Sequence, residues 1–267
     1  MAKQLRELLG NANPIFGFSW WEPDVAIAVS KAGGVGVWGC TRRTPDEIEA
    51  GITRMKKELG DLPWGVDLVI PNGMPEDNNR ETIEAQLPEE HVRFVDGLRQ
   101  KYGVPDDGLP GYRSRFVRSE ETARAQLNVV MDHQIPVLAL GIGSPTWAVE
   151  KAHEHGSLIL SLVGQPRHAE SALRAGADIL VAQGSDAGGH TGSIGTFSLV
   201  PQIVDLAQGV PVLAAGGVAT GRHLTASLAL GAQGVWLGTA FLGSAEAAPS
   251  PGLLKKLIAA QAADTVI

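Results

Sequence analysis

Short runs of apolar, often β-branched residues recur along the chain, and a stretch with helical character follows each of them. Most of these runs are apolar at every position, which is the pattern of parallel strands covered on both faces. Strands that alternate with helices indicate βαβ units and a parallel sheet. The pattern predicts eight strands, at Pro14–Ser19, Val35–Cys40, Trp64–Ile70, Ile135–Gly141, Leu158–Val163, Ile179–Gln183, Val210–Ala215 and Gly234–Gly238.

Capping residues mark the ends of the intervening helices. Thr44, Pro45 and Asp46 supply an N-cap, a proline in the first turn and an acidic first turn for a helix that runs to about Leu59. A Gly33–Gly34 pair ends the helix before it. The other predicted helices are Asp24–Ala32, Ser119–Gln134, Trp147–His155, Arg167–Ala175, Leu199–Ala207, His223–Leu230 and Leu253–Ala263.

One segment departs from this alternation. Residues 72–118 separate the third strand from the helix that opens at Ser119, far more than an ordinary βα connection. The segment contains a predicted helix, Arg80–Tyr102, and a return rich in proline and glycine, Val104–Gly111. Because barrel active sites lie at the carboxyl ends of the strands, we interpret the insertion as a lid or substrate wall. The alternative is that the insertion is a peripheral addition to the fold without a role in the active site.

Eight βα units fit either a closed barrel or an open, doubly wound sheet. The 267 residues suit one (β/α)₈ barrel, which typically needs about 250 residues. No Gly-x-Gly-x-x-Gly fingerprint follows the first strand, which disfavours a dinucleotide-binding open sheet. The predicted fold is therefore α/β, a (β/α)₈ TIM barrel forming a single domain over residues 1–267, with an insertion after the third strand.

Composition and charge exclude several classes of function. The net charge is −7 without a basic stripe, so we expect no nucleic-acid partner. No apolar run is long enough to span a bilayer, and the first ten residues lack the apolar core of a signal peptide. The single cysteine, Cys40, excludes an internal disulfide and a multi-cysteine metal site. We expect a soluble cytoplasmic protein that binds no membrane and no metal.

The most informative stretch runs from Gln183 to Gly192, QGSDAGGHTG, directly after the sixth predicted strand. Its glycines let the backbone approach a planar ligand closely and leave amide N–H groups that can point at it. His190 lies among them, and an imidazole is a suitable base near neutral pH. The alternative is a flexible polar loop in which the histidine is incidental.

Two further glycine-bearing turns follow the last two strands. Ala214–Val218 (AAGGV) comes after the seventh strand, and Gly238 and Thr239 come after the eighth. Phosphate sites in barrels often form from these two loops and a helix N-terminus. Glycines expose backbone amides, Thr239 adds a hydroxyl and Arg222 a positive charge. Each turn alone also fits a tight strand-to-helix connection, but together they predict a phosphorylated ligand.

Three stretches carry a resemblance to a known family. They are PDVAIAVSKAGGVGVWG at residues 23–39, QGSDAGGHTG at 183–192 and AAGGVATGRHLTASLALGAQGVWLGTAFLGSAEA at 214–247. With them the chain resembles the nitronate monooxygenase (2-nitropropane dioxygenase-like) family of FMN-dependent barrels, which also includes flavin-dependent enoyl reductases. The last two motifs are specific, and the resemblance covers nearly the whole barrel.

The resemblance implies that FMN binds at the carboxyl ends of the strands. His190 falls on the family's catalytic histidine, the base that removes the proton α to a nitro group. The implied reaction oxidises a small molecule, a nitroalkane or nitronate, with O₂; the alternative reduces an enoyl thioester with NAD(P)H. A homodimer is one candidate assembly, and the sequence does not decide the oligomeric state. The implied cofactor-binding residues are Ser19, Asp67, Gln183, Gly188, Gly189, Gly216, Gly217, Trp236, Leu237, Gly238 and Thr239.

Two positions depart from the family pattern. The first strand of the family usually ends in Pro-Met-Ala, whereas Phe16–Trp21 reads FGFSWW, and its two tryptophans would form an aromatic wall beside the substrate. Asp67 stands where the family commonly has an asparagine that bonds the flavin. A carboxyl group there must accept a hydrogen bond from the flavin N3–H or be protonated, and it disfavours an anionic reduced flavin.

Two hypotheses from other classes stay open at this point. One is a non-catalytic barrel that binds a sugar phosphate or flavin as a sensor or a partner subunit. His190 within an intact glycine loop argues against it. The other is a lyase or isomerase that binds only a phosphate, and such a protein would lack the yellow colour of a flavin.

Overall fold

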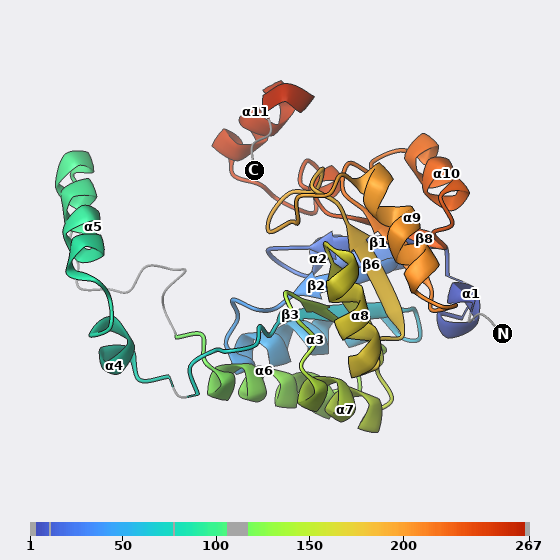
Figure 1. Cartoon of the computed structure of the whole chain (residues 1–267), viewed down its shortest axis with the longest axis horizontal. Helices are drawn as coiled ribbons and strands as arrows, with labels where there is room; N and C mark the ends of the chain where they lie inside the picture. The colour runs from blue at the N-terminus through green and yellow to red at the C-terminus, as the bar shows by residue number, and fades with distance from the viewer. Residues whose placement is uncertain (1–3, 11, 77, 106–116, 265–267) are drawn as a thin grey trace. The chain divides into compact units, whose positions relative to one another are not determined.

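A computed structural model describes residues 4–10, 12–76, 78–105 and 117–264 (Figure 1). Its sheet is a closed barrel of parallel strands in sequence order, and the last strand pairs with the first. This confirms the predicted (β/α)₈ barrel over the open sheet. The strands are β1 (Ile15–Ser19), β2 (Val35–Gly39), β3 (Trp64–Val69), β4 (Val137–Gly141), β5 (Leu158–Val163), β6 (Ile179–Gln183), β7 (Val212–Ala215) and β8 (Gly234–Leu237).

Helices surround this barrel and follow the predicted alternation. Thr44 caps α3 as expected: its hydroxyl accepts from the Glu47 N–H at 3.3 Å, and the Glu47 carboxylate accepts from the Thr44 N–H at 2.8 Å. The helices are α1 (Leu5–Leu8), α2 (Asp24–Lys31), α3 (Pro45–Leu59), α6 (Glu120–Asp132), α7 (Thr146–Glu154), α8 (Pro166–Ala175), α9 (Thr196–Leu206), α10 (Gly221–Ala229) and α11 (Pro251–Ala259), with short 3₁₀ turns at Thr239–Phe241 and Ala262–Asp264.

The barrel interior is filled by apolar side chains from alternate strand positions. The Trp236 ring stacks on Phe16 and Phe18 there, with ring centroids 6.2 and 5.8 Å apart. Leu5 and Leu9, at the unpredicted short helix α1, join the same apolar cluster. The Leu5 N–H donates to the Gln233 side chain at 2.8 Å, which fixes α1 against the barrel.

The chain divides into two compact units, one of residues 1–72 with 126–267 and one of residues 73–125. The second unit contains α4 (Arg80–Glu84) and α5 (Glu89–Tyr102), so the prediction of one continuous helix over Arg80–Tyr102 is wrong. Pro88 is the reason, because its ring disfavours a helical conformation at the preceding residue and it serves as the N-cap of α5.

Part of the predicted return Val104–Gly111 lies outside the described residues. The role of residues 72–118 as a lid or substrate wall stays a prediction, as does the interpretation of the chain as one FMN-binding domain. No helix in the described part of the chain is both long enough and apolar enough to cross a membrane.

Candidate active site

All eight strands are parallel, so the loops that follow them emerge at one end of the barrel. The site residues predicted from sequence lie near this end. Ser19 and Gln183 are the last residues of β1 and β6, and Asp67 lies on β3. The glycine-rich loops after β6, β7 and β8 complete the end of the barrel that we call the mouth.

The loops after β6 and β7 are tied together by Thr196, the first residue of α9. Its hydroxyl donates to the backbone carbonyl of Gly216 at 3.0 Å. A Cβ atom at Gly184 or at Gly216 would lie 2.3 or 2.5 Å from the Thr196 hydroxyl oxygen, closer than atoms can approach. Glycine is therefore required at both positions, and sequence reasoning missed the threonine that imposes this requirement.

The loops after β6 and β8 also meet. A Cβ atom at Gly188 would lie 3.0 Å from the Thr239 hydroxyl oxygen, although the two residues are far apart in sequence. Gly216 and Gly217 have φ values of +103° and +67°, which favour glycine. The three loops thus form a cradle of bare backbone, defined here as residues 184–192, 216–217 and 238–239. Exposed backbone N–H groups of this kind are what an anionic group needs.

Asp186 holds the cradle onto α9. Its carboxylate accepts from the Thr196 backbone N–H at 2.7 Å, and this hydrogen bond holds the pKa of Asp186 below its usual value. Gly195 is the N-cap of α9 and has no side chain to accept that bond, so Asp186 takes the role from nine residues upstream. Sequence reasoning missed this residue too, because no short-range capping pattern marks it.

His190, the predicted base, lies in the cradle and is exposed. It follows Gly189, whose φ of +86° turns the chain at this point. Within the described residues no hydrogen bond occupies either nitrogen of its imidazole ring. The side chain is thus available to a molecule bound at the mouth, which is the arrangement that a general base needs.

Asp67 is the only buried acidic residue in the described part of the chain, at 6% exposure. Its register partners are Gly39 on β2 and Ala139 on β4, and Ala139 belongs to the interior cluster. The Asp67 side chain therefore faces the barrel interior, since residues in register on parallel strands share a face. Burial raises the pKa of Asp67 to about 7.

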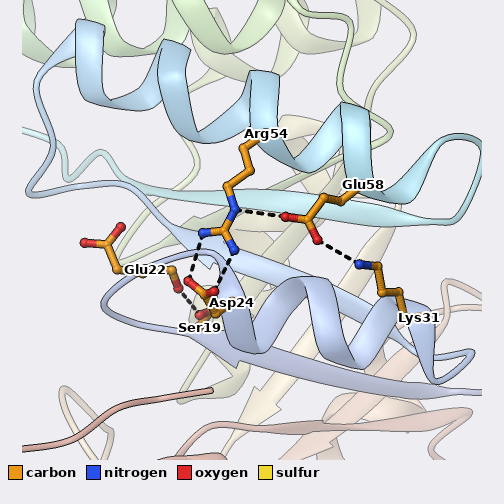
Figure 2. Close-up of polar contacts among 6 residues, drawn as sticks. All are labelled: Ser19, Glu22, Asp24, Lys31, Arg54 and Glu58. Atoms are coloured by element: carbon orange, nitrogen blue, oxygen red, sulfur yellow. Dashed lines mark hydrogen bonds and ion pairs between the residues drawn. The ribbon is translucent and has the colours of Figure 1, made fainter. Parts of the chain in front are cut away.

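The loop after β1 carries the tryptophan pair. Ser19 is buried, and its hydroxyl donates to the backbone carbonyl of Glu22 (Figure 2). Trp20 and Trp21 are 44% and 49% exposed and pack edge to face, with ring centroids 5.3 Å apart. Arg43 donates to the Trp21 carbonyl and pairs with the Glu22 carboxylate at 2.9 Å. The loop is thus fixed while the two indole rings remain accessible.

An ionic network anchors the helix that follows this loop. Arg54 on α3 bonds both carboxylate oxygens of Asp24, the first residue of α2, at 2.6 and 3.1 Å (Figure 2). The same guanidinium bonds Glu58 at 2.9 Å, and Glu58 bonds Lys31 at the other end of α2 at 2.7 Å. Arg54 holds the pKa of Asp24 below its usual value. We call these four residues the α2–α3 network.

Two of the flavin contacts predicted from the sequence, Trp236 and Leu237, lie outside the cradle. Trp236 packs in the barrel core against the phenylalanines of β1, and Leu237 after it is only partly buried. Contact of either residue with a flavin stays a prediction.

Arg222 is exposed on α10. Among the described residues, no three His, Cys, Asp or Glu side chains are grouped as a metal site would require.

A closed parallel barrel with functional side chains in the loops at the carboxyl ends of its strands has the architecture of a TIM-barrel enzyme. Residues 13–267 match the family model described as nitronate monooxygenase, so the chain belongs to that family. This confirms the resemblance carried by the three sequence stretches. The family is flavin-dependent, and the protein is an oxidoreductase.

Similar proteins agree with this assignment. A relative from Mycobacterium tuberculosis, named "Putative monooxygenase Rv1533", is 40% identical over all of this chain and 73% of its own length. Nitroalkane oxidase from Streptomyces ansochromogenes is similar in structure, with a TM-score of 0.76, 29% identity and coverage of 94% of this chain and 71% of its own. FabK from Thermotoga maritima has a TM-score of 0.75 at 28% identity and covers 100% of this chain and 71% of its own.

Proposed function

We propose that this protein is an FMN-dependent oxidoreductase that oxidises a nitroalkane, a nitronate or a similar substrate with an acidic C–H bond, with O₂ as the electron acceptor. The observation that carries the proposal is the glycine cradle, in which three loops meet around exposed backbone and one of them presents His190. The likeness to nitroalkane oxidase supports the substrate class.

The residues present suit FMN. The cradle offers backbone N–H groups to a phosphate, and Thr239 adds a hydroxyl beside Gly188. Asp67 offers a buried carboxyl group that has no hydrogen-bonding partner within the described residues. When bound, the flavin accepts electrons from the substrate. Ser19, Gln183, Gly189, Gly238, Trp236 and Leu237 complete the set of proposed contacts.

His190 acts as the general base in this proposal. A nitro group acidifies the neighbouring C–H bond, and the imidazole takes that proton. The exposed position of His190 in the cradle lets it face a substrate at the mouth. Trp20 and Trp21 form one wall of the substrate site, because they stand exposed on the fixed loop after β1.

The second candidate is reduction of an enoyl thioester with NAD(P)H, and the likeness to FabK fits it. Anaerobic mixing of the flavin-loaded protein separates the two reactions, since bleaching of the visible flavin bands reports reduction. Bleaching by a nitronate or nitroalkane but not by NAD(P)H is the result we expect. Bleaching by NAD(P)H alone would establish the second candidate, and bleaching by neither would refute both.

A further inference from the structure

Asp67 has an environment that no other acidic residue of the described chain shares. It is buried inside the barrel, and the strand positions beside it carry no polar side chain: Gly39 on one side and Ala139 on the other. The Asp67 carboxylate lies near Gly141, the last residue of β4, since a Cβ atom added at Gly141 would be 3.8 Å from its Oδ2 atom. The carboxyl group therefore lies near the carboxyl end of β4, which is the mouth end of the barrel.

Among the described residues, no cation stabilises this group in its ionised form. On β2, β3 and β4, no other residue that ionises near neutral pH accompanies Asp67. Cys40, just after β2, interacts with Asp67, and the pKa of its thiol is raised by burial and by the proximity of Asp67. Arg43 interacts with the Trp21 carbonyl and with Glu22. Burial alone raises the pKa of Asp67, so a substantial fraction is protonated near neutral pH.

A protonated carboxyl group offers one donor and one acceptor side by side. The matching partner is a group in which an N–H stands next to a carbonyl, and the imide edge of a flavin pyrimidine ring has this arrangement. An ionised carboxylate accepts from the N–H but repels the neighbouring carbonyl oxygens. The neutral form of Asp67 therefore complements this edge better than the charged form does.

We propose that Asp67 binds the imide edge of the flavin as a neutral carboxylic acid, so that flavin binding is linked to the protonation of this one side chain. The inference rests on the proposed function, because it needs a flavin at the mouth. Binding selects the protonated form and raises the pKa of Asp67 further. Flavin affinity is then fully present below the pKa of the free protein. It weakens by up to about tenfold per pH unit above that pKa, until the pKa of the complex is reached.

The test is a titration of FMN fluorescence with the protein at pH values from 6 to 9. Asp67→Asn is the matched control, because a carboxamide has the same donor and acceptor but no proton to lose. We expect the affinity of the unchanged protein to fall about tenfold per pH unit above pH 7, while Asp67→Asn loses far less. The FMN phosphate also titrates, near pH 6, but it does so equally in both proteins, so the difference between them reports Asp67.

A second variant keeps the test decisive if Asp67→Asn does not fold. Asp67→Ala removes both hydrogen bonds and is expected to bind FMN roughly 5- to 100-fold more weakly than the unchanged protein at pH 6, with the shallow pH dependence expected of the asparagine variant. Parallel pH profiles for the unchanged protein and a folded variant would overturn the inference, and so would an affinity that rises with pH. If none of the proteins binds FMN at any pH, the proposed function itself fails.

Discussion

Single residues at the mouth determine both the chemistry and the shape of the site. His190 is exposed in a loop that is otherwise built from glycine and small residues, so its imidazole can meet a substrate. Gly184 and Gly216 are required because Thr196 packs against both. Asp67 is buried, and burial raises its pKa to about 7, so its charge changes near neutral pH.

Replacement of His190 by alanine removes the proposed base. We expect the turnover of a neutral nitroalkane to fall by about 10²–10⁴-fold, the usual contribution of a positioned base. FMN binding should be retained, because the backbone of the cradle is unchanged. Steady-state oxygen consumption measures the loss, and oxidation of the preformed nitronate is the control, since that substrate has already lost its proton. Unchanged turnover of the nitroalkane would remove His190 from the mechanism.

Gly216→Ala tests the cradle directly. The added methyl group would lie 2.5 Å from the Thr196 oxygen at a φ of +103°, so the loop must shift. We expect the free energy of unfolding to fall by roughly 1–3 kcal/mol and FMN binding to be lost. Gly221→Ala, in the first turn of α10, is the matched control, because a Cβ atom there meets nothing within 4 Å. Equal FMN binding by the two variants would show that the cradle does not hold the cofactor.

The buried Asp67 also makes stability depend on pH. Its pKa is raised to about 7 in the folded protein from its ordinary value of 3.8, so the unfolded chain releases this proton at lower pH than the folded chain does. Stability without FMN is therefore greatest below about pH 4 with respect to this group and falls as the pH rises toward 7. Asp67→Asn should be more stable than the unchanged protein by a few kcal/mol at pH 8.

Urea unfolding at pH 5 and at pH 8, without FMN, measures this difference. The advantage of Asp67→Asn should be clearly larger at pH 8 than at pH 5. An advantage that is the same at both pH values would mean that Asp67 titrates in its usual range. Asp264→Asn, at an exposed residue outside the barrel, is a control that should show no such change.

Secondary-structure elements hold these residues in place. The loop that carries Trp20 and Trp21 is fixed at its beginning by Ser19 and Arg43, and the helix after it is fixed by the α2–α3 network. Arg54 bonds Asp24 and Glu58 at once, which joins the beginning of α2 to the end of α3. The network therefore supports the wall of the mouth from the outside of the barrel.

Arg54→Ala breaks the α2–α3 network at its centre. The residues involved are partly exposed, so solvent screens their attraction, and we expect a loss of only about 1 kcal/mol in the free energy of unfolding. High salt should reduce the difference. Arg93→Ala, which removes an exposed pair with Glu89 within one helix, is the control and should change stability less. A loss no larger than that of the control would show that the network adds no measurable stability.

Much of the element order is predictable from sequence, because strands buried on both faces are apolar throughout and Thr44 has a local capping pattern. Two features of the secondary structure could not be predicted from the sequence. Helix α1 is too short to have a pattern of its own and exists through the contacts of Leu5 with the barrel. The break before α5 lies inside an otherwise helical pattern, where Pro88 decides the outcome.

The site likewise contains residues that the sequence predicts and residues that it does not. His190 and the glycines are visible as a motif, so sequence reasoning places them in the right loops. Thr196 and Asp186 act through tertiary contacts with residues that are distant in sequence or lack a local signature, and no spacing rule finds them. Gly39 and Ala139 lie beside Asp67 because β3 pairs with β2 and β4, and closure of the barrel puts that face of the sheet inside.

At the scale of the whole molecule, the barrel gathers loops from distant parts of the chain at one mouth. The net charge is −7, so the protein as a whole does not attract an anionic cofactor. In the proposed function, the backbone N–H groups of the cradle supply the attraction for the FMN phosphate. This explains why glycines, rather than a cluster of basic residues, mark the site in the sequence.

The most direct measurement is a visible absorption spectrum of the purified protein after it has been mixed with FMN and desalted. We expect the two flavin bands, in the blue and near-ultraviolet, to remain with the protein in about equimolar amount, and to be absent from Gly216→Ala treated in the same way. A colourless protein, with all of the FMN in the low-molecular-mass fraction, would show that the cradle holds another phosphorylated ligand or none, and the proposed flavin chemistry would be withdrawn.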